Sequence, residues 1–141
     1  MTKIGFSYLQ LPLIDTITGR VDKVYKPIIP IRLSYHHSNP TQFFDALVDS
    51  GSDRNLLPVG LGVLAGVNFK KAKKTKIIGI GNHVINAYTS QINIWVEGKE
   101  YKTEADFSPE QQVPLLGRRG FFDLFKMIQF DENKKWIDIE L

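Results

Sequence analysis

The sequence predicts an all-β domain, built as a small closed barrel, and three observations lead to this fold class. Apolar and polar residues alternate along residues 90–97 and partly along residues 28–35, which is the period-2 pattern of strands with one buried face. Gly, Pro, Asn and Asp punctuate the chain at short intervals, as they do between the strands of small barrels. The 141 residues, 43% of them hydrophobic, suffice for one domain with a real core, and we assign residues 1–141 to it.

The expected elements follow one another with short connections. The expected strands are residues 28–35, 43–48, 90–97, 101–107 and 113–118. A turn at residues 97–100 joins two of them into a hairpin. Helix is expected in only two places, a turn after Pro58 and a short C-terminal helix at residues 119–125. Three phenylalanines spaced i, i+1 and i+4 in the second place would anchor that helix to the core.

Both ends of the chain extend beyond this set of strands. Residues 1–25 form an N-terminal extension, in which residues 6–14 alternate enough to predict either an extra strand or an arm on a partner. Residues 131–141 turn the chain into an extra C-terminal strand. In this strand, Trp136 and Ile139 are candidates for an interface.

The segment 46–52, Ala-Leu-Val-Asp-Ser-Gly-Ser, is the most informative part of the sequence. An apolar strand runs directly into Asp49, so the strand would hold this carboxylate rigidly at a tight turn. Gly51 lets backbone lie close to the carboxylate, and the hydroxyls of Ser50 and Ser52 can fix its orientation. A lone carboxylate held in this way suggests aspartic peptidase chemistry. Because Asp, Ser and Gly are also ordinary turn residues, a plain loop is the alternative.

Two further segments agree with the first. Residues 77–85 read as two short β arms joined by a glycine-rich tip, which is the pattern of a mobile hairpin lid. Residues 113–118 form an apolar strand that ends in Gly-Arg, and the amphipathic segment 119–126 follows. In order and spacing, these three blocks resemble the retroviral-type aspartic proteases, the retropepsins, and in particular their small single-chain cellular relatives. Residues 28–130 carry the resemblance.

The resemblance implies the retropepsin fold and a role for each residue of the triplet. Asp49 would be the catalytic aspartate, Ser50 stands where the family has Thr or Ser, and Gly51 completes the triplet. In that family the hydroxyl forms a hydrogen-bonded lock across a two-fold axis. Ser50 would therefore pair with Ser50 of a second subunit.

The resemblance also assigns a lid and a brace. Ile80 would be the tip of the hairpin, between Gly79 and Gly81, and the hairpin would act as a flap over the substrate. Arg118 would pair with Asp53 and brace the site without taking part in the chemistry.

The chemistry needs two carboxylates, whereas the chain has one such triplet. The resemblance therefore implies a homodimer in which two Asp49 carboxylates meet at the axis. Two like charges about 3 Å apart cannot both ionise, so the pair would share one proton. The ionised carboxylate would take a proton from a water molecule that attacks the scissile carbonyl of a peptide or protein substrate, and its partner would polarise the carbonyl oxygen. A bell-shaped pH profile is expected.

Apolar pockets and one hydroxyl complete the expected site. The pockets would be lined by Leu56, Ile80, Val113 and Leu115. If the Ser52 hydroxyl donates to Asp49, the ionised form is favoured and the pH optimum moves toward acid. The alternative is that Ser52 satisfies only backbone groups of the turn.

Composition bears on compartment and partners. The chain has no cysteine, which excludes disulfides and is compatible with a reducing compartment. The first residues lack the apolar run of a signal peptide, and no apolar stretch is long enough to span a bilayer. We therefore expect a cytoplasmic protein without a membrane partner. The sequence offers no good metal cluster, and no cofactor or metal is expected.

A basic run at residues 70–76 contributes to the net charge of +3. It could contact phosphates, but it lacks interleaved aromatic residues and lies just before the first arm of the hairpin. We interpret it as a solvated loop and expect no nucleic-acid partner.

Two functional classes remain. The first is an active homodimeric aspartic endopeptidase, favoured because Asp49, the triplet hydroxyl, the glycine-flanked hairpin and the Asp53/Arg118 brace occur together. The second is a catalytically inactive retropepsin-fold module that binds peptide strands or serves as a dimerisation platform. The unusual ends of the chain favour the second class, because they could give a dimer in which the two Asp49 side chains do not meet.

Overall fold

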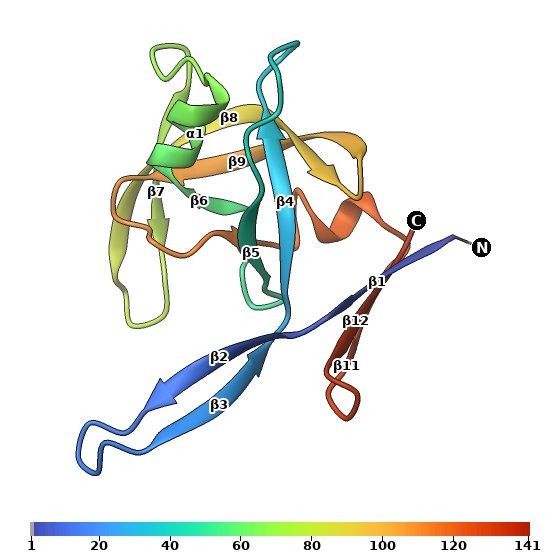
Figure 1. Cartoon of the computed structure of the whole chain (residues 1–141). Coiled ribbons are helices and arrows are strands. Elements are labelled where there is room, and N and C mark those ends of the chain that lie inside the picture. Colours follow the sequence, from blue (N-terminus) through green and yellow to red (C-terminus); the bar gives the residue numbers. More distant parts are fainter. Residues whose placement is uncertain (1) are drawn as a thin grey trace.

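A closed barrel of six strands, to which a seventh strand is attached, forms the body of the protein. The computed structural model describes residues 2–141. The sheet has the order β4-β5-β10-β6-β9-β8-β7, and an additional pairing of β4 with β8 closes it on itself (Figure 1). Its strands are β4 (Ile28–Ser34), β5 (Phe44–Val48), β6 (Leu56–Pro58), β7 (Lys73–Ile78), β8 (Val84–Val96), β9 (Lys99–Ser108) and β10 (Leu115–Leu116). The all-β, barrel-like fold class is confirmed.

The barrel closes because β8 is long enough to pair with three strands. It runs antiparallel to β7 at its start, to β9 along most of its length and to β4 near its end, where Arg32 lies opposite Trp95. Alternate side chains point into the barrel, as the period-2 pattern predicts. The large apolar side chains that are buried on β4 and β8 are Ile29, Ile31, Leu33, Ile92, Ile94 and Val96. These residues form the centre of the core.

The single α-helix, α1 (Val59–Ala65), begins directly after Pro58 and lies at one end of the barrel (Figure 1). It occupies the place where the sequence predicts a helical turn. Gly66 ends it in the left-handed conformation at φ 86°, which satisfies carbonyl groups of the last turn. Gly62 packs closely on the core, because a Cβ there would lie 2.6 Å from the ring of Phe69.

The short C-terminal helix expected at residues 119–125 is a single 3-10 turn, η1 (Phe122–Leu124). Gly120 lies at φ 104° and Phe125 is extended, so the chain leaves helical geometry on both sides of the turn. Phe121 and Phe125 are buried, so the segment is anchored to the core as its spacing predicts. Across residues 2–141, no helix has the length and apolar character needed to cross a membrane.

The two ends of the chain meet in a separate three-stranded sheet. β1 (Lys3–Ser7) and β11 (Met127–Asp131) each pair antiparallel with β12 (Trp136–Glu140), which lies between them. Ile139 is fully buried in the core of the monomer, so its assignment as an interface residue is wrong. Trp136 is 38% exposed and stays a candidate for an interface.

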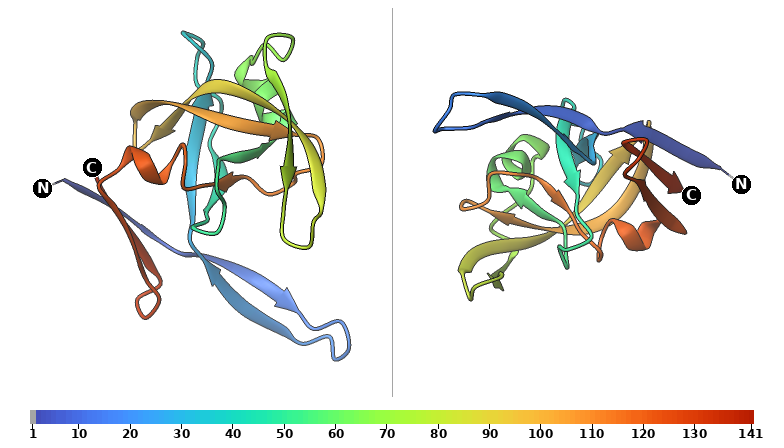
Figure 2. Two further views of the ribbon diagram at one scale, coloured as in Figure 1. Left: turned by 180° about the vertical axis from the view of Figure 1, so that it is seen from behind. Right: turned by 90° about the horizontal axis from the view of Figure 1, so that it is seen from below.

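A two-stranded hairpin projects from the body between these parts. β2 (Leu9–Ile14) and β3 (Val21–Lys26) pair antiparallel and extend away from the barrel in every view (Figures 1 and 2). We call residues 9–26 the arm. The N-terminal extension thus contributes both an added strand, β1, and a protruding hairpin.

Tyr8 ties the start of the arm to the terminal sheet. Its side chain is buried, and its hydroxyl donates to Oε1 of Glu132 at 2.8 Å. Its backbone N–H donates to the carbonyl of Lys135 at 2.8 Å. Burial is the largest of the causes that raise the pKa of Tyr8 to about 12, and the hydrogen bond with Glu132 is the next.

The substitution Tyr8→Phe should weaken the dependence of stability on alkaline pH. Because the pKa of Tyr8 lies above its ordinary value of 10.0, its stabilising effect is complete below about pH 10 and is lost as the pH rises toward about 12. In urea titrations, the free energy of unfolding should therefore fall more between about pH 9 and pH 11 in the parent than in Tyr8→Phe. The control Tyr25→Phe, which changes an exposed tyrosine of β3, should behave as the parent does. The same pH dependence in all three proteins would contradict this role of Tyr8.

Candidate active site

β5 places Asp49 in a tight turn at one end of the barrel. The N–H of Asp49 donates to the carbonyl of Leu116 at 2.9 Å, so β10 holds the backbone of this residue. Its Oδ1 accepts a hydrogen bond from the N–H of Gly51 at 2.9 Å, and its carbonyl accepts one from the N–H of Ser52 at 3.1 Å. Ser50, between them, is exposed. The backbone of its own turn therefore orients the Asp49 carboxylate.

The Ser52 hydroxyl has a different partner from the catalytic candidate. It donates to the backbone carbonyl of Arg54 at 2.7 Å. Of the two alternatives for Ser52, the structure has the one in which the hydroxyl satisfies a backbone group of the turn, and the alternative hydrogen bond to Asp49 is not the one formed. The Arg54 carbonyl lies within reach of the hydroxyl and accepts its hydrogen bond.

β7 and β8 form the hairpin expected at residues 77–85, but its first strand begins earlier, at Lys73. Residues 73–76 pair with β8, so the interpretation of the basic run 70–76 as a solvated loop is wrong for them. The strands stay in register as far as Ile78 and Val84. The turn beyond them includes Gly81 at φ 83°, a conformation that glycine adopts without strain. Ile80 at the tip is fully exposed. The tip extends past the barrel at the end where the turn after β5 also lies (Figure 1).

An open hollow of about 810 Å³ lies between the Asp49 turn and this hairpin. The expected site residues that line it are Asp49, Gly51, Ser52, Asp53, Leu56, Gly79, Ile80 and Leu115. Those that lie outside its lining are Ser50, Gly81, Val113 and Arg118. Val113 is 51% exposed and precedes β10, which begins only at Leu115. The structure thus brings most of the expected site together around one hollow.

The expected ion pair between Asp53 and Arg118 is not formed within residues 2–141. Both side chains are exposed. Backbone hydrogen bonds join the two segments instead, from the N–H of Arg118 to the carbonyl of Ser52 and from the N–H of Arg119 to the carbonyl of Asp53, each 2.9 Å long. The Coulomb energy of an exposed ion pair is small and is offset by the entropy lost when two side chains are ordered. The backbone hydrogen bonds therefore hold the two segments together.

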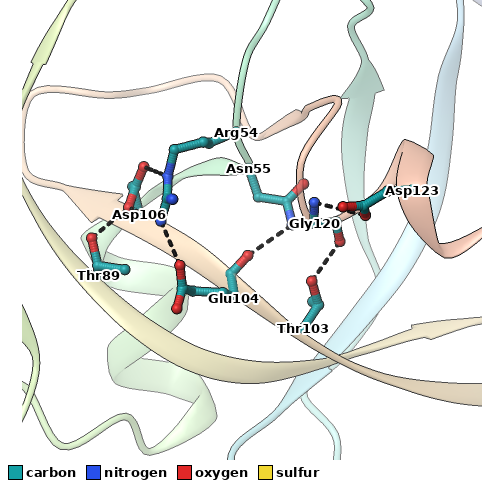
Figure 3. Close-up of polar contacts among 8 residues, drawn as sticks. All are labelled: Arg54, Asn55, Thr89, Thr103, Glu104, Asp106, Gly120 and Asp123. Atoms are coloured by element: carbon teal, nitrogen blue, oxygen red, sulfur yellow. Dashed lines mark hydrogen bonds and ion pairs between the residues drawn. The ribbon is translucent and has the colours of Figure 1, made fainter.

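Arg54 is the centre of a polar network beside the hollow that the sequence analysis did not identify (Figure 3). Its guanidinium donates to both carboxylate oxygens of Asp106, at 2.8 Å and 3.1 Å, and to Oε1 of Glu104 at 2.7 Å. The hydroxyl of Thr89 donates to Asp106 at 2.6 Å. Asp106 is only 1% exposed, and these charge-assisted bonds compensate the burial of its charge.

Arg54 pairs with two of the four carboxylates that line the hollow. The hydrogen bonds with Asp106 are the largest cause that raises the pKa of Arg54, and those with Glu104 add to it. The guanidinium therefore stays protonated and forms ion pairs with both acids. Within residues 2–141, no ion pair is formed by Asp49 or Asp53, the other carboxylates that line the hollow.

The fully buried Asn55 joins three segments behind the site (Figure 3). Its side-chain N–H donates to the carbonyl of Glu104 at 3.0 Å, and its Oδ1 accepts a hydrogen bond from the N–H of Gly117 at 3.0 Å. Its own carbonyl accepts a hydrogen bond from the N–H of Asp106 at 2.9 Å. Gly117 is required here, because a Cβ would collide with the carbonyl of Arg54.

A second hollow of about 850 Å³ shares Arg54 and Glu104 with the first. Its lining mixes acidic and basic side chains with His36 and His37, and it does not include Asp49. We place the candidate site in the first hollow, because that hollow contains the carboxylate held at the strand-turn junction. Within residues 2–141, no group of three or more His, Cys, Asp or Glu side chains is placed to hold a metal ion.

Comparison with known proteins supports the fold assignment. Neither protein-family models nor curated protein sequences match the chain. Among solved structures, it is similar to a retropepsin-like aspartic protease from Rickettsia conorii, with a TM-score of 0.58 and 17% identity over 98% of this chain and 92% of that one. It is also similar to the EIAV protease in complex with the inhibitor HBY-793, with a TM-score of 0.48 and 22% identity over 66% of this chain and 82% of that one.

The likeness to the Rickettsia conorii structure extends over almost the whole chain, including both terminal extensions. At 17% identity, this likeness concerns the fold alone. The chain therefore has the fold of a retropepsin-like aspartic protease, and the resemblance inferred from its three sequence blocks is confirmed at the level of fold.

The substitution Asn55→Ala should destabilise the protein strongly. It leaves the buried N–H of Gly117 and the carbonyl of Glu104 without their partner, and we expect the free energy of unfolding to fall by about 2–4 kcal/mol. Urea titration measures this change. The control Asn39→Ala alters an exposed residue and should change stability by less than about 0.5 kcal/mol. Similar stabilities of the two variants would show that Asn55 does not join the segments.

The substitution Ser52→Ala should lower stability slightly and leave the pH profile of peptide cleavage unchanged. The lost hydrogen bond to the Arg54 carbonyl is worth about 1 kcal/mol in urea titration. Because the hydroxyl donates to the Arg54 carbonyl, its removal leaves the hydrogen bond between the Gly51 N–H and the Asp49 carboxylate in place. A shift of the cleavage optimum in Ser52→Ala would contradict this assignment of the hydroxyl.

Proposed function

We propose that this protein is an aspartic endopeptidase that acts as a homodimer. The observation that carries the proposal is the position of Asp49, whose carboxylate is held by the Gly51 N–H at the end of a strand and lines a hollow beneath a protruding hairpin. The fold shared with a retropepsin-like aspartic protease supports the same conclusion. Because the identity to that structure is only 17%, the likeness supports the fold, and the peptidase activity is our proposal.

The other acids of the hollow support a second copy as the source of the second carboxylate. Asp106 is buried and bound by Arg54 and Thr89, and Glu104 is bound by Arg54. Asp53 is exposed, and no hydrogen bond or ion pair within residues 2–141 positions its carboxylate. A catalytic carboxylate has to be positioned by its surroundings, as Asp49 is. A two-fold dimer supplies a second, equally positioned Asp49.

The chemistry of such a pair follows from two acids sharing one proton. The ionised Asp49 takes a proton from a water molecule held between the two carboxylates, and this water attacks the scissile carbonyl carbon. The protonated Asp49 of the other copy donates a hydrogen bond to the carbonyl oxygen, where negative charge develops. Collapse of the tetrahedral intermediate breaks the C–N bond, and a proton from the pair passes to the leaving amine.

The substrate of this proposal is a peptide in extended conformation between the Asp49 pair and the hairpins. Leu56, Leu115 and Ile80 give the hollow apolar walls for alternate side chains of such a peptide. The exposed Ile80 at the tip would become covered when the hairpin closes over a bound peptide. We therefore assign the hairpin β7–β8 the role of a flap.

One observation favours the alternative function, a binding or dimerisation module without activity. The Asp53–Arg118 brace that the resemblance implies is not formed. A chain that keeps the fold but not the activity has no need of that brace. The two functions are separated by the cleavage experiment that follows.

The substitution Asp49→Asn should abolish peptide cleavage without unfolding the protein. Cleavage of a mixed peptide library from about pH 3 to pH 7 should fall by about 100-fold or more, because the amide cannot take a proton from water. The matched control Asp45→Asn changes an exposed carboxylate on the same strand, β5, and should retain the activity of the parent.

Two outcomes would contradict the peptidase proposal. Cleavage that persists in Asp49→Asn would place the chemistry elsewhere. Folded dimers of parent and variant that both fail to cleave any peptide would leave the binding module as the leading function.

A further inference from the structure

The arm, residues 9–26, is a two-stranded ribbon that the rest of the chain leaves largely uncovered. Its six cross-strand pairs run from Leu9 and Lys26 to Ile14 and Val21. Figures 1 and 2 show the ribbon projecting clear of the barrel and of the terminal sheet. An isolated two-stranded hairpin is only marginally stable in water, because neither of its faces is buried. A partner that buries the faces of the ribbon would stabilise it.

Apolar side chains occur on both faces of the arm. Because paired residues of an antiparallel ladder share a face, Leu11 and Val24 lie on one face, and Ile14 and Val21 lie on the other. Leu13 is 56% exposed, Ile14 61% and Val21 62%. Apolar side chains that gather on one element and remain this exposed mark an interaction surface.

The arm projects from the end of the molecule at which the candidate site opens. In Figure 1 the turn after β5, which carries Asp49, the tip of the hairpin β7–β8 and the arm all extend toward one end, and α1 lies at the other. The site at that end holds one Asp-Ser-Gly triplet and so half of a carboxylate pair. A second copy of the chain is therefore required at the end toward which the arm extends.

The terminal sheet offers less uncovered apolar surface than the arm. Its central strand, β12, is paired on both edges by strands of the same chain. Ile137 and Ile139 of this strand are fully buried within the monomer. Among large apolar side chains, the terminal sheet exposes Met127 and Trp136, whereas the arm exposes six, so the arm is the stronger candidate for the contact between two copies.

We propose that the arm is a dimerisation arm, which packs its apolar side chains against a second copy of this chain. The identity of the partner rests on the proposed function, because the carboxylate pair needs that second copy. In a two-fold dimer each copy extends its arm to the other, so the same contact forms twice. The arms cover apolar faces that the monomer leaves open, and they hold the two Asp49 turns together through residues that take no part in the chemistry.

The test compares two double variants of the full chain. Ile14→Thr with Val21→Thr replaces a cross-strand pair of the arm by polar residues that keep the strand propensity of β-branched side chains. The control, Val63→Thr with Leu64→Gln, replaces two residues of α1 that are 63% and 74% exposed and lie at the opposite end of the molecule. Circular dichroism and thermal unfolding verify that each protein is folded, and sedimentation equilibrium measures its dimer dissociation constant.

The dissociation constant of the arm variant should be about tenfold or more above that of the parent. The α1 variant should stay within about twofold of the parent. An arm variant that dimerises as tightly as the parent would overturn the proposal. A parent that remains a monomer at every concentration would overturn it as well.

Hydrogen exchange of the parent gives a second readout that needs no substitution. Backbone amides of β2 and β3 should exchange more slowly in concentrated than in dilute protein, while amides of α1 should not change. Exchange of the arm that does not depend on concentration would overturn the proposal. Neither readout uses peptide cleavage, so the two proposals can fail separately. A dimer that is held by its arms but cleaves no peptide would contradict the proposed function and would support the role of the arm in dimerisation.

Discussion

The hydrogen bonds of the buried Asn55 side chain are the constraint on which the candidate site depends. They join the segment that follows the Asp49 turn to β9 and to Gly117, which follows β10. Asp49 is itself held by the backbone of β10, so any movement of β10 moves the carboxylate. A buried amide group that loses its partner costs more than a single hydrogen bond contributes, and the three segments therefore stay together or separate together.

The carboxylates on the two sides of the hollow differ in their ion pairs, and we call the side where they are paired the structural side. On the structural side, Arg54 neutralises Asp106, which is buried and would be costly without this pairing. On the other side, Asp49 is only half-buried and has a backbone N–H as its hydrogen-bond donor, with no cation beside it among residues 2–141. Asp106 thus holds β9 against Arg54, whereas Asp49 faces the hollow and forms no ion pair among residues 2–141.

The terminal extensions form two different parts of this architecture. One part, β1 with β11 and β12, completes a sheet within a single chain and buries its own apolar residues. The other, the arm, leaves apolar residues exposed on both faces and extends from the end where the half-site lies. The dimeric site that we propose would depend on how firmly the two copies are held, and the proposed dimerisation arm would provide a contact surface that is separate from the reacting groups.

Local patterns determined much of this protein. Alternation predicted β4 and the later part of β8, and turn chemistry predicted the hairpin and the placement of Asp49, because these features depend on residues that are neighbours in the sequence. The short strand β6 and the start of β7 were not predicted. Pairings between distant residues were not predictable in this way. Asn55 and Gly117 are 62 positions apart, and Arg54 lies 52 positions from its partner Asp106, so no local pattern connects them. The sequence by itself therefore determined the strands, the turns and the residue types of the site. Only the tertiary structure decided which polar side chains form hydrogen bonds with one another. The reason is that residues distant in the sequence come within hydrogen-bond distance only when the barrel closes.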